Sequence, residues 1–254
     1  MKSKFWIISY PFLIVFAILV TYILWYIPEN EEHALQNIQT RTIQNDGYCV
    51  LFDKDYLNTK NKLCKKLEHD ALRQLPEGYM FMDYVYIIKQ TALSTFHRDV
   101  TSSQHLFHTK HPVYTMILYK YEGELLSVCP YSDKTYPFVI SNITNIHGPA
   151  GTVFLFNSEV LHAGMKNNCQ DREVIQYKIC HKDDLHLLQH LQNIHQTKND
   201  VCKQGWYEEF VRKGSYYLQL PINYLFYPFM IKREKNNWTG YIQSFIPITF
   251  YNNL

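Results

Sequence analysis

The feature that most constrains the fold of this chain is a succession of short apolar runs that are separated by turn residues. The runs are rich in β-branched and aromatic residues, so each of them is predicted to be a strand. In chain order they read GYCVLFD, YMFMDYVYIIKQ, VYTMILYKY, YPFVISN, GTVFLFN and REVIQYKIC. An aromatic content of 16% supports this interpretation, because aromatic side chains favour half-buried positions on a sheet. The sequence therefore predicts a mainly β fold with flanking helices, a sandwich or barrel rather than an alternating α/β sheet.

One amphipathic helix is predicted between the first and the second run. Apolar residues recur there at three- and four-residue intervals from Leu57 to Leu75, and the opposite positions carry lysines. Pro76 and Gly78 follow the last apolar position and are expected to end the helix.

A second segment with helical spacing, HKDDLHLLQHLQNIHQ at 181–196, contains two histidines four positions apart. Such a pair could belong to a zinc protease, which would need a glutamate directly after the first histidine as its general base. His186 is followed by Leu187, so His186 and His190 are predicted to lie on the polar face of a helix.

The N-terminal region is predicted to be a membrane anchor. The run of residues 5–27 contains no charged side chain, and it is long enough for a helix to cross a hydrocarbon layer of about 30 Å. Lys2 and Lys4 precede this run and acidic residues follow it, which favours a cytoplasmic N-terminus. A cleaved signal peptide is the alternative, but aromatic residues crowd the end of the run where a cleavage site would need small ones.

The expected organisation is a transmembrane signal-anchor at 1–27, a polar stalk at 28–45 and one domain at 46–254 that ends in a helical and aromatic extension. The domain would be lumenal or extracellular, as in single-pass membrane proteins of the ER or Golgi. Acceptor triplets for glycosylation begin at Asn142 and Asn237. All six cysteines follow the predicted span, so at least one disulfide is expected, with reduced core thiols as the alternative.

The charge distribution argues against a nucleic-acid partner. The formal net charge is +2, and no long basic run is present. A domain that binds nucleic acid would be expected to carry a basic patch or stripe. We therefore expect small molecules, rather than a nucleic acid, as ligands.

The motif TFHRDVTSSQ at 95–104 admits two interpretations. His97-Arg98-Asp99 could be the catalytic loop of a protein kinase, which places Asn five residues after the Asp. Position 104 is Gln, the chain has neither a Gly-rich phosphate loop nor Asp-Phe-Gly, and the predicted body is rich in strands. A kinase is therefore disfavoured.

The alternative is one half of a metal site. Non-haem iron oxygenases use two histidines and one carboxylate on one face of the metal. Alternate residues of a strand point the same way, so His97 and Asp99 can reach one ion. His162 lies at the far end of the run GTVFLFN and could supply the second imidazole. Ten residues later comes Arg172, whose planar guanidinium suits the far carboxylate of a dicarboxylate cosubstrate.

On these motifs, in this order and spacing, the chain resembles the Fe(II)/2-oxoglutarate-dependent dioxygenases, and among them it looks most like the phytanoyl-CoA dioxygenase group. The resemblance covers roughly residues 47–180. The segment LLSVCPYSDK is similar to an apolar-strand-then-Pro-Gly-Ser-His element of that group. Tyr131 stands where the group usually has Gly, and Asp133 where it usually has His, which leaves the subgroup open.

The resemblance implies a double-stranded β-helix, or jelly roll, with His97, Asp99 and His162 as iron ligands. It also implies that Arg172 binds the 5-carboxylate of 2-oxoglutarate, and Gln176, on the same strand face, is expected to support that cosubstrate. The expected cofactors are Fe(2+), 2-oxoglutarate and O2, and a need for ascorbate is left open. The implied reaction is hydroxylation of an unidentified substrate, which could be a protein side chain, a lipid or a glycan.

Two alternatives of other classes stay open. The first is a catalytically inactive dioxygenase fold that serves as a binding module. The second is a type II membrane glycosyltransferase, which is suggested by the predicted topology alone and would call for an Asp-x-Asp metal motif on an α/β sheet.

Overall fold

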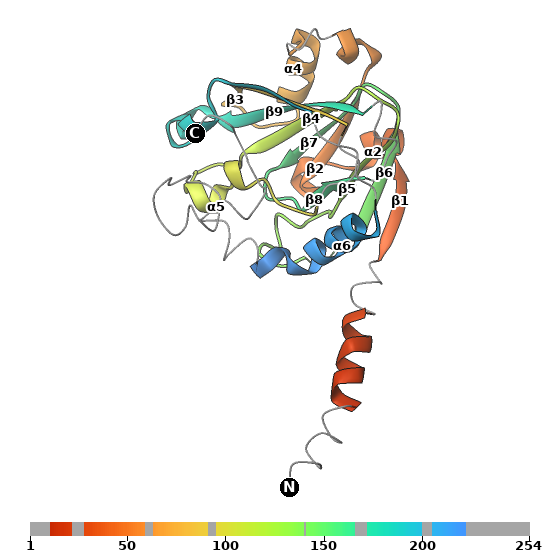
Figure 1. Ribbon diagram of the computed structural model, residues 1–254. Helices are drawn as coiled ribbons and strands as arrows, with labels where there is room; N and C mark the ends of the chain where they lie inside the picture. Colours follow the sequence, from red (N-terminus) through yellow and green to blue (C-terminus); the bar gives the residue numbers. More distant parts are fainter. Residues whose placement is uncertain are drawn as a thin grey trace.

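A computed structural model of the protein describes residues 11–21, 28–58, 63–90, 95–139, 141–165, 172–199 and 205–221 (Figure 1). Two β-sheets form the body. The six-stranded sheet has the order β10–β3–β9–β4–β7–β2, and the four-stranded sheet has the order β1–β6–β5–β8. Helices flank both sheets. The prediction of a mainly β fold with flanking helices is confirmed, and the two facing sheets are consistent with a jelly roll.

The strands of the larger sheet are β10 (Ile194–Asn199), β3 (Tyr79–Lys89), β9 (Glu173–His181), β4 (Tyr114–Tyr119), β7 (Thr152–Asn157) and β2 (Tyr48–Phe52). Those of the smaller sheet are β1 (Glu29–His33), β6 (Ile143–Gly148), β5 (Gly123–Val128) and β8 (His162–Gly164). Strand β10 pairs with β3, and β1 with β6, in parallel, whereas the other pairs are antiparallel.

The α-helices of the domain are α2 (Ala34–Thr40), α3 (Ile43–Asp46), α4 (Lys65–Leu72), α5 (Gln104–Phe107) and α6 (Trp206–Pro221). Short 3₁₀ turns are η1 (Lys54–Asn58), η2 (Val100–Ser102), η3 (Lys182–Leu187) and η4 (Gln189–Leu191).

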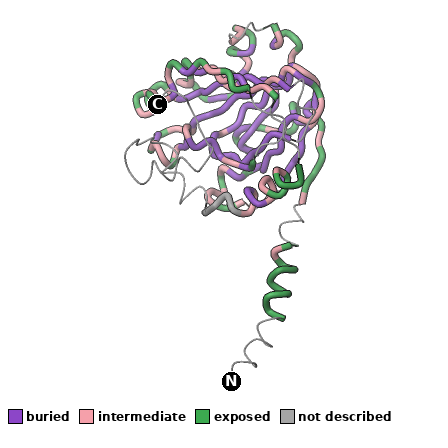
Figure 2. The backbone as a smooth tube through the Cα atoms, viewed as in Figure 1, coloured by how far each residue is buried: buried purple, intermediate pink, exposed green. Residues whose placement is uncertain are grey.

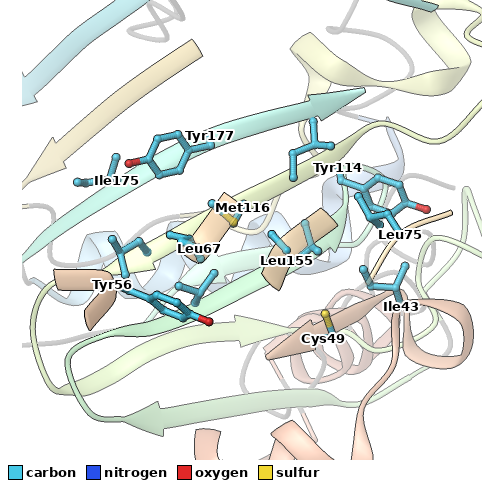
Figure 3. Close-up of a cluster of buried hydrophobic side chains, with 14 of the residues drawn as sticks. Ile43, Cys49, Tyr56, Leu67, Leu75, Tyr114, Met116, Leu155, Ile175 and Tyr177 are labelled. Atoms are coloured by element: carbon cyan, nitrogen blue, oxygen red, sulfur yellow. The ribbon is translucent and has the colours of Figure 1, made fainter. Parts of the chain in front are cut away.

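Both faces of the larger sheet are buried at its central strands, which explains why β4, β7 and β9 read as nearly continuous apolar runs. On β7, Phe154 and Phe156 point between the two sheets, while Leu155 points to the opposite face. That outer face packs against α4 through Leu67 and forms the cluster drawn in Figure 3. The central strands are accordingly buried along most of their length (Figure 2).

Helix α4 occupies part of the predicted helix at 57–75. Leu67 and Ala71 are buried beneath it, as the apolar spacing requires. Its N-terminal cap is Cys64, whose Sγ accepts from the backbone N–H of Leu67 at 3.4 Å. The segment between residues 54 and 58 is the separate turn η1, and residues 59–62 lie outside the described part.

Residues 28–45, which were expected to form a stalk, are part of the domain instead. Strand β1 pairs with β6, and α2 and α3 contact β2. The polar composition misled the prediction because the charges pair with one another: Arg41 binds Glu32 at 2.6 Å and Asp46 at 3.1 Å. The apolar Ala34 and Ile43 enter the two core clusters.

The predicted anchor falls only partly within the described residues. Residues 11–21 form a helix whose large apolar side chains are exposed (Figure 2), and 5–10 and 22–27 lie outside the described part. Within the described ranges, no helix has both the length and the apolar character needed to cross a membrane.

The expected strand YPFVISN is not formed by its described residues. The chain turns repeatedly there, with the N–H groups of Lys134 and Thr135 both donating to the carbonyl of Tyr131. Pro137 has no N–H for a strand ladder, which gives the physical reason for the error. The strand of this region is β6, which begins at Ile143.

The helix predicted at 181–196 is also wrong: the segment contains the 3₁₀ turns η3 and η4 and then β10. Leu188, Leu191 and Ile194 are buried as expected. Asp184 in η3 binds a distant loop. Its carboxylate accepts from the backbone N–H groups of Lys110 and His111, at 3.0 and 2.8 Å, and from Nδ1 of His111 at 2.9 Å.

Asp184→Asn is expected to lower the free energy of unfolding by about 1–3 kcal/mol near pH 7, because two backbone N–H groups and an imidazole would lose a charged acceptor. Burial opposes ionisation, but the backbone N–H groups and His111 hold the pKa of Asp184 below its usual value. A depressed pKa stabilises the fold above the unfolded pKa of about 3.9, and this contribution disappears as the pH falls through the folded pKa.

Urea denaturation of both proteins near pH 7 and near pH 3 tests this expectation. The difference in the free energy of unfolding between wild-type and Asp184→Asn protein should be smaller near pH 3 than near pH 7. An equal difference at both pH values would contradict the prediction. Asp183→Asn is the control, because the neighbouring Asp183 side chain is 55% exposed.

Candidate metal centre

Two histidines from distant parts of the chain lie side by side in an antiparallel bridge. His97 precedes η2, His162 begins β8, and each backbone N–H donates to the other residue's carbonyl, at 2.9 and 3.0 Å. Residues paired in this way project their side chains to the same face, and the two ring centroids are 4.5 Å apart. The bridge therefore brings the two imidazoles together on the edge of the smaller sheet.

Asp99 directs its carboxylate to the same point. Its Oδ1 lies 3.8 Å from Nε2 of His97 and 3.7 Å from Nε2 of His162. Its backbone N–H donates to the carbonyl of Ser158 at 2.8 Å, which ties it to the loop after β7. Arg98 points elsewhere and donates to backbone carbonyls at 2.8 and 3.1 Å. The structure thus gathers the three side chains that were predicted as metal ligands.

Backbone carbonyls orient both imidazole rings. Nδ1 of His97 lies 2.7 Å from the carbonyl of Thr95, and Nδ1 of His162 lies 2.9 Å from the carbonyl of Val160. A carbonyl can only accept, so each Nδ1 carries the proton of the neutral ring. Each Nε2 therefore presents a lone pair toward Oδ1 of Asp99, which is the arrangement typical of histidine metal ligands.

The spacing and the donor set fit a divalent ion. One ligand atom from each of the three residues can be chosen so that all lie within 4.8 Å of one another. Atoms bound at about 2.1 Å from one ion are up to about 4.2 Å apart, so small side-chain movements suffice. His162 and Asp99 are buried, whereas the side chain of His97 is 43% exposed, which leaves one side open. Two imidazoles and one carboxylate with an open side match a non-haem iron(II) site.

Electrostatics keep His162 and Asp99 in the protonation states that a metal requires. Burial, and then the neighbouring His97, lower the pKa of His162 to about 4, so this ring is neutral near pH 7. Burial alone would raise the pKa of Asp99, but Lys178 and the two imidazoles together hold it well below its usual value. The site therefore offers a neutral imidazole and a carboxylate at physiological pH.

A fully buried lysine contacts the carboxylate from the side away from the imidazoles. Nζ of Lys178 lies 2.7 Å from Oδ2 of Asp99, 2.8 Å from Oγ of Ser102 and 2.7 Å from Oγ1 of Thr115. Thr115 also donates its hydroxyl to the same Oδ2. Burial lowers the pKa of Lys178, and the contact with Asp99 opposes that fall. No sequence motif indicated this residue, because a lysine inside REVIQYKIC looks like an outward position.

Arg172, which directly precedes β9, is buried with part of its guanidinium unsatisfied. Among the described residues, its Nε and Nη1 have no hydrogen-bond partner, and its Cζ lies 6.0 Å from the ring centroid of Tyr121. Leaving buried donors of a charged group unpaired is costly, so this position suits an anionic ligand. Gln176, which was predicted to support the cosubstrate, lies on the same strand, and its Nε2 is 3.5 Å from Oδ2 of Asp99.

Helix α6 contacts both of the segments that carry the two histidines. Oγ of Ser215 accepts from the backbone N–H of Phe96 at 2.8 Å. Arg212 lies over the Phe96 ring at 4.6 Å and donates to the carbonyl of Gly164 at 2.6 Å. Phe96 directly precedes one histidine and Gly164 follows the other by two positions, and Figure 1 shows α6 beside β8. No sequence motif signalled this contact, because the helix lies far from both segments in the chain.

The other predicted metal motifs lie away from this centre. His186 is exposed, whereas His190 lies 2.7 Å from the carbonyl of Thr101 and stacks on a phenylalanine, so they form no zinc pair. The chain also contains an Asp-x-Asp sequence, the pattern used by many glycosyltransferases. Both of its carboxylates, Asp53 and Asp55, pair with Lys66 at the surface.

The two departures from the family pattern have separate structural roles. Tyr131 has a φ of 64°, the left-handed region in which glycine is the usual residue, and its side chain is 45% exposed. Asp133 accepts from Nδ2 of Asn157 at 3.3 Å, and burial raises its pKa. It does not belong to the cluster of three ligands.

The four cysteines in the described part, Cys49, Cys64, Cys129 and Cys180, are free. Cys169 and Cys202 lie outside the described residues, so the expected disulfide stays a prediction. Asn142 is exposed, as glycosylation requires, and Asn237 lies outside the described residues.

Comparison with known proteins gives only distant matches. No protein-family model matches the sequence, and no curated protein matches it. The solved structure of EvdMO1 is 12% identical, with a TM-score of 0.42, and the match covers 59% of this chain and 50% of that one. This chain therefore matches half of the length of EvdMO1.

Two further structures show the same level of likeness. AviO1 from Streptomyces viridochromogenes Tue57 is 10% identical with a TM-score of 0.44, over 59% of this chain and 95% of that one. The non-heme alpha ketoglutarate dependent epimerase SnoN from nogalamycin biosynthesis is 10% identical with a TM-score of 0.40, over 58% and 83%. At these values, the side chains of the site itself have to carry any inference about chemistry.

Proposed function

We propose that the protein is an Fe(II)- and 2-oxoglutarate-dependent dioxygenase that hydroxylates an as yet unidentified substrate. The observation that carries this proposal is the convergence of two Nε2 atoms on Oδ1 of Asp99, at 3.8 and 3.7 Å, with both Nδ1 atoms bound to carbonyls. His97, Asp99 and His162 would hold the iron. When bound there, iron supplies the oxidation of a substrate C–H bond by O2, coupled to conversion of 2-oxoglutarate into succinate and CO2.

The chain's own residues would bind and orient the reactants. Arg172 would pair with the 5-carboxylate of 2-oxoglutarate through its guanidinium, two of whose donors lack partners among the described residues. Tyr121 beneath it would keep the guanidinium in place. Gln176 would steady Asp99 and the cosubstrate from the same strand. The apolar layer between the sheets, including Phe156 against His162, would exclude water from the reaction.

The finer assignments belong to the same proposal. The residues shared with the phytanoyl-CoA dioxygenase group support that subgroup, with Tyr131 and Asp133 as departures. The substrate would be a protein side chain, a lipid or a glycan, and the use of ascorbate stays open. The uncharged run at 5–27 supports a single-pass anchor with a cytoplasmic N-terminus and a lumenal or extracellular domain that is glycosylated.

A second candidate is an inactive binding module, and one observation favours it. The ammonium of Lys178 already lies 2.7 Å from the carboxylate of Asp99, so the cluster has a positive partner without a metal ion. An inactive module would fold normally and bind neither iron nor 2-oxoglutarate.

Anaerobic titration of the full-length protein with Fe(II) and 2-oxoglutarate separates the two candidates. The proposal expects a visible metal-to-ligand charge-transfer band that saturates at one equivalent of each ligand. A folded protein that develops no such band would contradict the proposal and favour the binding module. Succinate release that needs both Fe(II) and O2 would then extend the result to turnover.

A further inference from the structure

Lys178 is buried so completely that its charge needs a specific explanation. Its side chain is 1% exposed, and it projects from β9 at the position paired with Thr115 on β4. A lysine is rarely buried to this degree unless its ammonium is paired and hydrogen-bonded.

The three acceptors around Nζ match the three N–H groups of an ammonium. They are Oδ2 of Asp99, Oγ of Ser102 and Oγ1 of Thr115, all between 2.7 and 2.8 Å. Both hydroxyls have other acceptors for their own protons, since Thr115 donates to Oδ2 and Ser102 to the carbonyl of Asp99. The network is therefore satisfied when Lys178 donates all three hydrogens.

The two oxygens of Asp99 consequently have different surroundings. Oδ1 faces Nε2 of His97 and of His162. Oδ2 accepts from Lys178 and Thr115 on the other side. A metal between the imidazoles would thus meet one oxygen of a carboxylate whose charge is already offset by an ammonium.

We propose that Lys178 is a positioning residue that acts through Asp99: it leaves only Oδ1 of this ligand available to a metal and offsets the negative charge of the carboxylate. A bound divalent ion would then retain more net positive charge to attract a dianionic cosubstrate. The inference rests on the proposed function, because it assumes a metal at the three ligands. It assigns to Lys178 opposite effects on two affinities: it weakens the binding of the metal and strengthens the subsequent binding of 2-oxoglutarate.

The test uses Co(II) as the probe metal and the full-length chain. Lys178→Met removes the ammonium and keeps an unbranched apolar side chain, and Thr115 still holds Oδ2. We expect Co(II) to bind about tenfold more tightly to the variant, and 2-oxoglutarate to bind about tenfold more weakly to the Co(II)-loaded variant. Calorimetric titration measures both dissociation constants and needs no turnover.

The control is Lys66→Met, which removes a surface lysine that is also paired with aspartates. Both affinities should match those of the wild-type protein. Lys178→Gln repeats the test without the charge but with a hydrogen-bond donor, and the same pair of opposite changes is expected.

Each outcome decides the matter. Equal affinities, or a loss of both, in Lys178→Met would overturn the inference and leave Lys178 a purely structural role. If the metal-free variant does not fold, folding should be restored by Co(II), which supplies the missing positive charge; failure of that rescue also overturns the inference. A wild-type protein that binds no Co(II) would instead remove the proposed metal centre, a result distinct from either of these.

Discussion

His162→Ala is expected to abolish iron binding at the centre and to lower Fe(II)-dependent succinate release by a factor of 10³ or more. The ring is buried, its Nε2 faces Oδ1 of Asp99, and its Nδ1 is bound to the carbonyl of Val160. Alanine removes one of three protein ligands and leaves a cavity next to Phe156 that no nearby imidazole can fill. The charge-transfer titration and a succinate assay measure the two losses.

His190→Ala is the matched control for this prediction. His190 is also a partly buried histidine, but its Nε2 lies near the carbonyl of Thr101 and its ring stacks on Phe107. The His190→Ala protein should retain the charge-transfer band. Far-UV circular dichroism has to show that both variants are folded. Retention of the band in a folded His162→Ala protein would refute the assignment of this histidine.

Arg172→Met is expected to weaken the binding of 2-oxoglutarate by a factor of 100 or more and to leave metal affinity unchanged. The guanidinium would lose a charge-assisted pair with the 5-carboxylate. The stability of the ligand-free protein should stay the same or increase, because Nε and Nη1 are buried without partners and methionine removes that penalty. A loss of ligand binding without a loss of stability is characteristic of a residue kept for function.

Calorimetric titration of the metal-loaded variant with 2-oxoglutarate measures the first effect, and thermal unfolding without ligand measures the second. Arg73→Met is the control, since Arg73 is exposed on the outer side of the domain and should affect neither quantity. If Arg172→Met bound 2-oxoglutarate normally, the dicarboxylate would have to bind elsewhere. A marked loss of ligand-free stability would show that the guanidinium has a structural partner.

The positions of the ligands could be predicted because they depend on local geometry. A strand alternates its side chains, so a His-x-Asp pair in an extended segment presents both groups to one side. His162 follows a run whose composition identifies it as a buried strand, which is β7 in the structure. Arg172 directly precedes β9, a long strand of the same sheet. Local chemistry and order along the chain were sufficient to name these four residues as candidates.

The errors arose where side-chain pairing in space overrides local composition. Residues 28–45 read as a polar stalk, yet Arg41 joins Glu32 to Asp46 and the segment closes the edge of the smaller sheet. The spacing at 181–196 reads as helical, yet Asp184 caps a distant loop instead. In both cases, a charged side chain finds its partner in the folded chain, and the sequence contains no sign of that partner.

The amino-acid sequence by itself determined the strand-rich architecture, the burial pattern of its central strands and the identity of the three candidate ligands. These properties follow from side-chain period and residue type, which are local. Only the tertiary structure decided that Lys178 lies against Asp99, that Arg172 keeps unpaired donors and that α6 braces Phe96. Contacts of this kind depend on where strands and helices that are distant in sequence pack together. The hydrophobic periodicity and the residue propensities along the chain are local and do not specify these contacts.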